Sequence, residues 1–253
     1  PMLVIHGGLG LDHSYFQPWL DPLQGGFRLI YPDLRGNGRS TPGPDADFTL
    51  QNMVADLDAL RDKLGIRQWI VLGHSYGGYL AQLYALTHPD HVSYLILADT
   101  SPAPRRLSHK EGAQLLALHM TPEIRQGFAH LLQPSSDEDW KKLWHTILPA
   151  YFYDFPTELL VAADQTVYRQ HALILGAGLS KNLDLRPRLG EIVSTPTLVA
   201  VGRRDGILPV SHSEALFKGI PGAEFVVFDR SGHFPFIEER DRFLGVMRRF
   251  LGD

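Results

Sequence analysis

The sequence predicts an α/β fold: a doubly wound, mostly parallel sheet with an inserted helical cap. Two observations lead to this class. Short aliphatic and β-branched runs recur along the chain, and segments with helical periodicity separate them. The runs are almost continuously apolar, which is typical of parallel strands covered by helices on both faces. We expect strands at residues 2–6, 27–32, 69–73, 92–99, 196–202 and 223–229.

The expected helices have start and stop signals. Apolar residues at helical spacing predict a helix over residues 50–64, and Gly65 follows as a stop signal. A second helix is expected from Tyr76 through His88. Ser211 and Glu214 have the spacing of a capping box before another helix. The last helix has an apolar stripe formed by Phe243, Val246, Met247 and Phe250.

Between residues 103 and 190 the pattern changes, because long apolar runs give way to segments that look helical. We interpret this stretch, 103–190, as a helical cap inserted into a core formed by residues 1–102 and 191–253. Because the insertion follows the fourth strand, it is expected to lie over the carboxyl ends of the strands, where open α/β sheets bind ligands. Helices are expected within it at residues 111–120, 137–148 and 157–175.

The composition argues against several classes of protein. The 253 residues carry a formal net charge of -4 with scattered Lys and Arg, so the sequence has no electrostatic footprint for nucleic acid. It contains no cysteine, which excludes disulfides, thiolate zinc sites and a cysteine nucleophile. No apolar run reaches the roughly 20 residues that span a bilayer, so no membrane partner is expected.

The sequence carries no metal or cofactor motif of the H-E-x-x-H, EF-hand, P-loop or dinucleotide-binding kind. We therefore predict no cofactor and no metal. The chain opens with PMLVIHGG, inside an expected strand and without an initiator methionine, so a signal peptide would not be visible in it. The expected location is cytoplasmic, and the expected state is a monomer or homodimer.

The stretch GHSYGG, residues 73–78, follows the apolar run WIVL and precedes a helix-like segment. A strand-to-helix turn that lifts a side chain out of the sheet needs strained backbone angles there and small neighbours. Gly73 and Gly77 are small neighbours of this kind. In this setting the G-x-S-x-G pattern predicts that Ser75 is an exposed nucleophile at the carboxyl edge of the sheet. An ordinary glycine-rich turn is the alternative.

An activated serine needs an imidazole base and a carboxylate that orients the imidazole. Asp205, in VGRRDG, and His233, in RSGHFPF, each follow an expected strand, so both are predicted at the same edge as Ser75. Asp99, in LADTSP, is the rival acid because it follows an earlier strand, and we favour Asp205. Other histidines lie on expected helices or their ends, where surface or core roles are the simpler interpretation: His88, His91, His109, His119, His130, His145, His171 and His212.

The HGGLG stretch, residues 6–10, follows the first expected strand, and its small residues let backbone N–H groups approach a substrate carbonyl. We predict that the N–H groups of Gly8 and Tyr76 form an oxyanion hole. A glycine turn with no catalytic part is the alternative. The later stretch DLRGNGRS is interpreted as a structural turn tied by Arg35 and Asp33.

Aromatic residues are frequent in the expected cap. They could line an acyl or aryl pocket for the substrate, or they could form the cap's own core, and the sequence leaves both interpretations open. These residues are Trp140, Trp144, Tyr151, Phe152, Tyr153 and Phe155.

Together these motifs resemble those of the α/β-hydrolase superfamily over essentially the full chain. The matching stretches are HGG after a strand, DLRGNGRS, GHSYGGYLAQLYALTHPDHV, VGRRDG and GHFPFIEERDRF. Within the superfamily the chain looks most like the proline iminopeptidase group, through VIHGGLG, RGNGRSTP and LDLRPRLGEIVSTPTLVAVG. The resemblance implies an acyl-serine intermediate, since dehalogenases and epoxide hydrolases of this fold carry Asp where this chain has Ser75.

The chain departs from the proline iminopeptidases where those enzymes are thought to hold the free amine of the substrate. A cap segment that reads like GPNEF in them reads GAGLS here, at residues 176–180, and Gly206 rather than an acid follows Asp205. A substrate ammonium would then lack a buried counter-ion, which is costly. Three cap acids could substitute for the missing ones: Glu111, Glu123 and Glu158.

The sequence therefore predicts a cofactor-independent serine hydrolase of carboxylic esters, lactones or small amides. Its expected partner is a small-molecule substrate of one of these kinds or a short peptide. Two alternatives stay open: a proline iminopeptidase, and a ligand receptor of the same fold without turnover.

Overall fold

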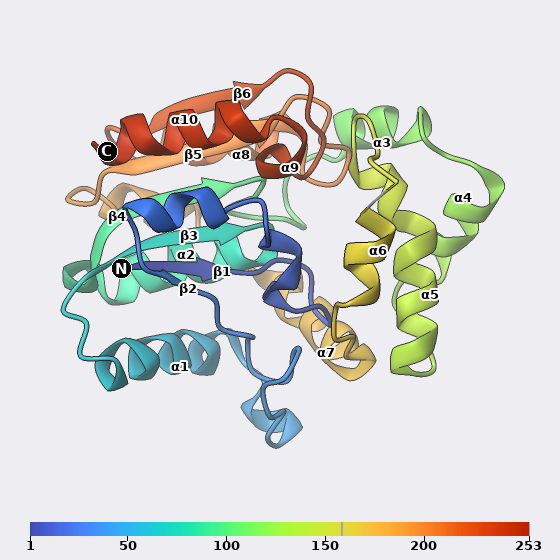
Figure 1. Cartoon of the computed structure of the whole chain (residues 1–253), viewed down its shortest axis with the longest axis horizontal. Coiled ribbons are helices and arrows are strands. Elements are labelled where there is room, and N and C mark those ends of the chain that lie inside the picture. Colours follow the sequence, from blue (N-terminus) through green and yellow to red (C-terminus); the bar gives the residue numbers. More distant parts are fainter. Residues whose placement is uncertain (158, 253) are drawn as a thin grey trace.

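The computed structural model describes residues 1–157 and 159–252, and its centre is a six-stranded sheet (Figure 1). The strand order is β2-β1-β3-β4-β5-β6, and all neighbouring strands are parallel. All six predicted strands are present, and the α/β class is confirmed. The strands are β1 (Met2–Ile5), β2 (Leu29–Ile30), β3 (Trp69–His74), β4 (Val92–Ala98), β5 (Thr197–Gly202) and β6 (Glu224–Phe228).

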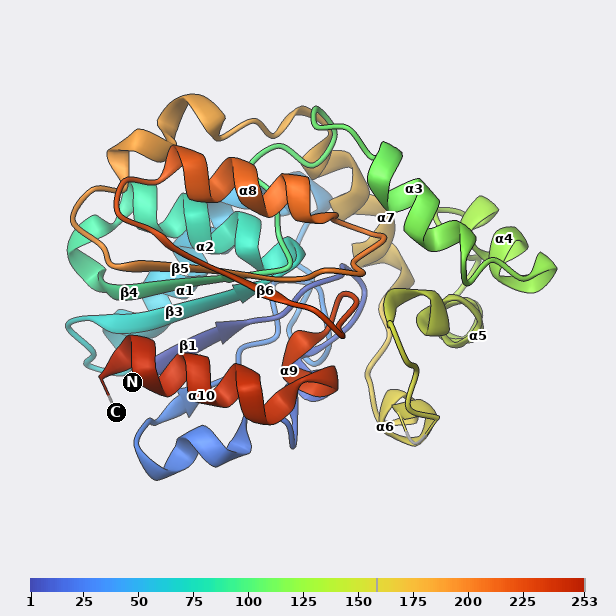
Figure 2. The ribbon, with the colours of Figure 1, turned by 90° about the horizontal axis from the view of Figure 1, so that it is seen from above.

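Helices cover both faces of the sheet (Figure 2). One face carries α1 (Leu50–Lys63), α2 (Tyr76–Thr87) and α8 (Val210–Gly219), and the other carries α10 (Arg240–Leu251). Side chains alternate along each strand, so one strand feeds two hydrophobic clusters. In β1, Leu3 and Ile5 pack in the first cluster, while Met2 and Val4 pack in the second. Burial on both faces explains the uninterrupted apolar runs.

Local signals account for both ends of α1. Thr49 begins α1 because its side-chain oxygen accepts the N–H of Asn52, and Gly65 follows the helix with a φ of 66°. The predicted helix over residues 50–64 is confirmed. The capping box at Ser211 is wrong, because α8 starts at Val210 after Pro209 and has no side-chain cap.

The helices of the insertion lie beyond the carboxyl ends of the strands (Figures 1 and 2). The single helix expected over residues 157–175 is wrong. The N–H groups of Val167 and Arg169 donate to Asp12 Oδ2 and to the Gly10 carbonyl of the core, so they do not continue a helix. The insertion contains α3 (Lys110–Ala117), α4 (Pro122–Ala129), α5 (Asp137–Ile147), α6 (Leu159–Asp164) and α7 (Gln170–Leu179). The cap boundaries at 103 and 190 stay a prediction.

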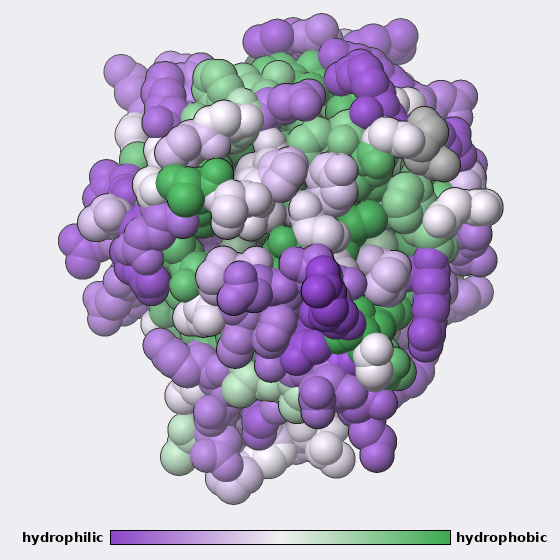
Figure 3. Space-filling model, turned by 90° about the vertical axis from the view of Figure 1, so that its left-hand side faces the viewer, coloured by the Kyte–Doolittle hydropathy of each residue, from purple (hydrophilic) through white to green (hydrophobic). Residues whose placement is uncertain are grey.

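The end of the molecule opposite the insertion is shown in Figure 3, where hydrophilic and hydrophobic residues are intermixed. None of the helices in the described part of the chain is both long and apolar enough to cross a membrane. The short helix α9 (Pro235–Glu238) follows β6.

Candidate active site

Ser75 occupies a strained turn between β3 and α2. Its φ of 53° and ψ of -119° are unusual for a residue other than glycine, and its side chain is partly exposed. The turn requires small neighbours: a Cβ on Gly77 would overlap the Ile5 carbonyl, and one on Gly73 would lie 2.5 Å from the Gly77 oxygen. The Ser75 carbonyl accepts the Thr100 hydroxyl at 2.7 Å. The tight turn predicted from GHSYGG is therefore present.

His233 and Asp205 form a buried pair at the same edge of the sheet. Asp205 follows β5 and His233 follows β6, and the His233 Nδ1 lies 2.7 Å from Asp205 Oδ2. The other carboxylate oxygen, Oδ1, accepts the N–H groups of Ile207 and Leu208 at 2.8 and 3.0 Å. Because a carboxylate only accepts, Nδ1 carries the proton and Nε2 is free to take one.

A hydrogen bond joins the serine turn to the histidine loop. His74, which precedes Ser75, lies with its Nε2 2.8 Å from the carbonyl oxygen of His233, and the two rings are 4.9 Å apart. Burial holds the pKa of His74 well below its usual value, so its ring is neutral and donates from Nε2. Within residues 1–157 and 159–252, no hydrogen bond links the Ser75 hydroxyl to the His233 ring. Such bonds are often long before substrate binds.

Tyr15 extends this network to the HGGLG loop, and sequence reasoning missed it. Its hydroxyl accepts the Gly7 N–H and lies 2.9 Å from the Nδ1 of His74. Burial raises the pKa of Tyr15, so the hydroxyl keeps its proton and donates it to His74. No local pattern marks Tyr15, because its partners come from other segments of the chain.

Two backbone N–H groups next to Ser75 have no acceptor. Across the described ranges, neither the Gly8 N–H nor the Tyr76 N–H makes a hydrogen bond. The loop that contains Gly8 is close to the serine, since a Cβ on Gly7 would lie 2.7 Å from the Ser75 Cβ. Gly8 has a φ of 39°, which suits glycine. These are the two donors predicted for the oxyanion hole.

Gly10, at the end of the same loop, is held from three sides. Its N–H donates to Asn37 Oδ1 at 2.6 Å. Its carbonyl accepts the Trp140 indole N–H at 2.8 Å and the Arg169 N–H at 2.9 Å. The insertion therefore fixes the loop, and Trp140, expected as a pocket residue or cap core, is a buried anchor for it.

The other cap aromatics divide between three places. Trp144 and Phe152 line an apolar cavity of about 40 Å³, which Tyr15 and Phe234 also border. The edge of the Tyr151 ring faces the His233 ring at 5.6 Å, and the Tyr151 carbonyl accepts the His233 N–H at 2.7 Å. Tyr153 is 41% exposed and lies outside that cavity, and the half-buried Phe155 packs on Phe152.

A second serine–histidine pair lies nearby and is fully buried. His212 Nδ1 is 3.0 Å from Ser101 Oγ, and His212 Nε2 is 3.2 Å from the Ser108 carbonyl. Burial lowers the pKa of His212, so its ring is neutral. The imidazole meets a carbonyl where a triad needs a carboxylate, and a buried hydroxyl cannot reach a substrate.

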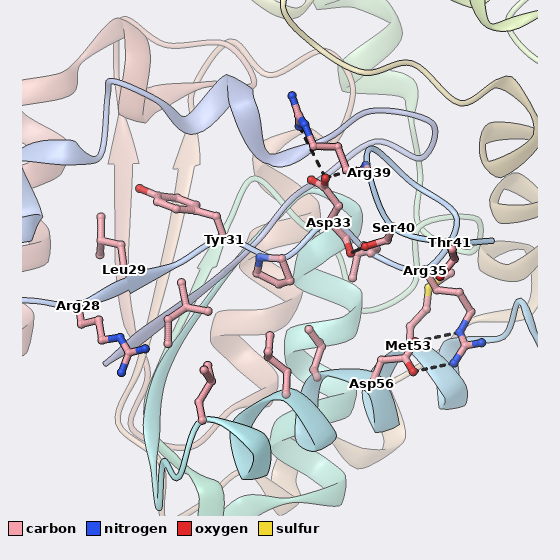
Figure 4. A pocket seen from close by; sticks show the side chains of 16 residues that line it. Arg28, Leu29, Tyr31, Asp33, Arg35, Arg39, Ser40, Thr41, Met53 and Asp56 are labelled. Atoms are coloured by element: carbon pink, nitrogen blue, oxygen red, sulfur yellow. Dashed lines mark hydrogen bonds and ion pairs between the residues drawn. The ribbon is translucent and has the colours of Figure 1, made fainter. Parts of the chain in front are cut away.

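A groove of about 830 Å³ runs between β2 and α1 and includes none of the predicted site residues (Figure 4). The DLRGNGRS turn borders it. Asp33 ties this turn as expected, by accepting the Arg39 N–H at 2.8 Å and contacting His13 at 2.7 Å. Arg35 also ties the turn, because its guanidinium makes two hydrogen bonds to Asp56 on α1.

The positions that depart from the proline iminopeptidases are packed. A Cβ on Gly206 would lie 2.8 Å from Leu116 of α3, and Leu179, which stands where GPNEF has its acid, is partly buried against the core. A carboxylate side chain at Gly206 has no room unless α3 moves. Of the three cap acids that could replace it, Glu111 and Glu123 are exposed, and Glu158 lies outside the described residues.

Comparison with known proteins agrees with this geometry. A family model described as the alpha/beta hydrolase fold matches residues 1–240, and the chain belongs to this family. The chain is 28% identical to a proline iminopeptidase from Pestalotiopsis fici, over 99% of this chain and 91% of that protein. It is also 28% identical to a pimeloyl-[acyl-carrier protein] methyl ester esterase from Aliivibrio salmonicida, over 98% and 91%.

Among solved structures, an esterase from Exiguobacterium antarcticum superimposes with a TM-score of 0.80 at 24% identity, covering 100% of this chain and 92% of that one. This likeness confirms the fold. The family and the curated relatives confirm the predicted enzyme class, a hydrolase.

Proposed function

We propose that the protein is a serine hydrolase of carboxylic esters, lactones or small amides, with Ser75 as the nucleophile. The observation that carries the proposal is the partly exposed Ser75 at a positive-φ turn, on the same sheet edge as the hydrogen-bonded His233–Asp205 pair. Strained, exposed serines in this setting are typical of nucleophile elbows.

In the proposed reaction, His233 Nε2 takes the Ser75 hydroxyl proton while the serine oxygen attacks the substrate carbonyl carbon. Asp205 keeps the His233 Nδ1 proton in place and stabilises the imidazolium. The N–H groups of Gly8 and Tyr76 bind the oxyanion of the tetrahedral intermediate, which typically contributes about 3 to 4 kcal/mol per donor. The leaving alcohol takes the proton from His233, and water then hydrolyses the acyl-serine by the same steps.

The packing beside His233 and the HGGLG loop favours an uncharged, apolar substrate group. The cavity of about 40 Å³ bordered by Tyr15 and Phe234 has aliphatic and aromatic walls, and no acid lines it in the described parts of the chain. A substrate ammonium in contact with these walls would lack a counter-ion. Packing at Gly206 leaves no room there for a carboxylate side chain, and Leu179 stands where the cap segment of the peptidases has an acid.

A proline iminopeptidase is the second candidate, because the chain is similar to one over 99% of its length. It predicts a strong preference for aminoacyl anilides over matched esters that lack a free amine. A ligand receptor of the same fold predicts tight binding without turnover.

The test is a panel of nitrophenyl esters, lactones and aminoacyl anilides on wild type and Ser75→Ala. We expect turnover of esters or lactones, and a loss of at least about 10³-fold in kcat with Ser75→Ala at an unchanged melting temperature. Higher kcat/KM on the anilides would favour the peptidase instead. Full activity in Ser75→Ala would refute Ser75 as the nucleophile.

A further inference from the structure

Asp99 is a second buried acid beside the His233–Asp205 pair. It follows β4, it is fully buried, and its φ of 46° is strained for a residue with a side chain. One carboxylate oxygen of Asp99, one of Asp205 and one ring nitrogen of His233 all lie within 4.8 Å of one another. The next residue, Thr100, donates its hydroxyl to the Ser75 carbonyl at 2.7 Å. Asp99 is therefore built into the turn that holds the proposed nucleophile.

The hydrogen bonds of Asp99 are incomplete. Its Oδ1 accepts the Gly202 N–H at 2.8 Å, and its Oδ2 is buried without a partner in the described structure. A buried carboxyl oxygen without a partner costs free energy, and such groups are often retained for a functional reason.

The electrostatics fit a carboxyl pair that shares one charge. Burial and then the nearby charge of Asp205 raise the pKa of Asp99 well above its usual value, and Glu238 adds a smaller effect in the same direction. Two neighbouring carboxylates cannot both ionise cheaply. Asp205 accepts two backbone N–H groups and the His233 N–H, so it holds the charge while Asp99 stays protonated.

We propose that Asp99 is a reserve acid of the site, a positioning residue that orients His233 when Asp205 cannot. This inference rests on the proposed serine hydrolase function. With Asp205 charged, the protonated Asp99 leaves a single negative charge beside the imidazole. With Asp205 replaced by Asn, Asp99 loses its proton to solvent and its carboxylate accepts the His233 Nδ1 proton.

The test compares wild type, Asp205→Asn, Asp99→Asn and the double variant by kcat and KM on the preferred nitrophenyl ester between pH 5 and 10. A triad without its acid typically loses about 10⁴-fold in kcat. We expect Asp205→Asn to lose only about 10²-fold, with activity that recovers as pH rises and Asp99 ionises. Asp99→Asn should lose about threefold, and the double variant about 10⁴-fold, with KM nearly unchanged in all three.

The outcomes separate this inference from the proposed function. Equal kcat in Asp205→Asn and the double variant overturns the role of Asp99 while leaving Ser75 as the nucleophile. Full activity in Ser75→Ala overturns the proposed function itself.

A second measurement covers the case in which Asp205→Asn does not fold. The proton on His233 Nδ1 gives a far-downfield NMR resonance when it is bonded to a carboxylate. This resonance should shift in Asp99→Asn relative to wild type if Asp99 interacts with the pair. An unchanged resonance overturns the inference.

Discussion

Two serine residues near the carboxyl ends of the strands each have a histidine nearby: Ser75 has His233, and Ser101 has His212. The two serines differ in their surroundings. Ser101 makes a 3.0 Å contact with His212, whereas the Ser75 hydroxyl makes no hydrogen bond to His233 within the described residues. Yet Ser101 is fully buried and Ser75 is partly exposed. His233 contacts a carboxylate through its other nitrogen, and His212 contacts a carbonyl.

A short serine–histidine contact alone therefore does not identify a nucleophile. A reactive serine needs access for the substrate, a base oriented by an acid, and donors for the oxyanion. Ser75 is partly exposed and lies on the same sheet edge as a histidine bonded to a carboxylate, whereas Ser101 is buried and its histidine contacts a carbonyl. The Ser101–His212 contact is a satisfied polar pair in the core.

Replacing His233 should reduce activity far more than replacing His212. We expect His233→Ala to lower kcat by about 10⁴-fold, because the serine loses its general base. His212→Ala removes a buried hydrogen-bonding ring, so it should cost about 2 kcal/mol of stability while kcat changes less than about threefold. Kinetics with the preferred ester and urea unfolding measure both. A reversal of these two effects would make Ser101 the better candidate.

An intermediate effect concerns the donors beside Ser75. Gly8→Ala puts a Cβ 2.9 Å from Leu11 at a position with positive φ, so the Gly8 N–H should turn away from the oxyanion. We expect kcat to fall by about 10²-fold. Gly65→Ala is the matched control, since Gly65 also has a positive φ and a Cβ there meets no atom within 4 Å. Both variants should lose about 1 kcal/mol of stability, but only Gly8→Ala should lose activity.

The pair of His13 and Asp33 should have only a small effect on stability. Its atoms are 2.7 Å apart, the same distance as in the His233–Asp205 pair. The hydrogen bond to Asp33 raises the pKa of His13, and hydrogen bonds from His13 and Arg39 outweigh burial and lower the pKa of Asp33. The stability from a raised histidine pKa is complete below pH 6.5 and disappears as pH rises through the folded pKa.

Between pH 6 and pH 9, the free energy of unfolding of wild type should therefore fall by at most about 1 kcal/mol more than that of His13→Gln. The difference is small because solvent screens a partly exposed pair. Urea unfolding at the two pH values measures this difference, and kcat should not change with the substitution. Identical pH dependence in the two proteins would mean that the pair contributes nothing.

The sequence predicted the strands, the serine turn and the positions of Asp205 and His233, because each depends on a local pattern of apolar runs and glycines. The insertion was harder to predict. Helix α4 was missed although Thr121 and Pro122 are a capping residue and a first-turn proline. The break between α6 and α7 depends on contacts of Val167 and Arg169 with the core, which no local pattern contains.

Residue roles set by long-range packing were beyond sequence reasoning. Trp140 anchors Gly10 across 130 positions of the chain, and the network from Tyr15 through His74 to His233 joins three segments. From the sequence, Asp99 and Asp205 were alternative candidates for the acid that orients His233. The fold brings both acids to one point, since neighbouring parallel strands β4 and β5 end together.

Covalent labelling identifies which serine is the nucleophile. Wild type is treated with a fluorophosphonate, which phosphonylates activated serines, and the labelled peptide is located by mass spectrometry. Our account predicts one adduct, on Ser75, that blocks ester hydrolysis and is absent from Ser75→Ala. An adduct on Ser101 or another serine that blocks hydrolysis, with Ser75 unmodified, would contradict it.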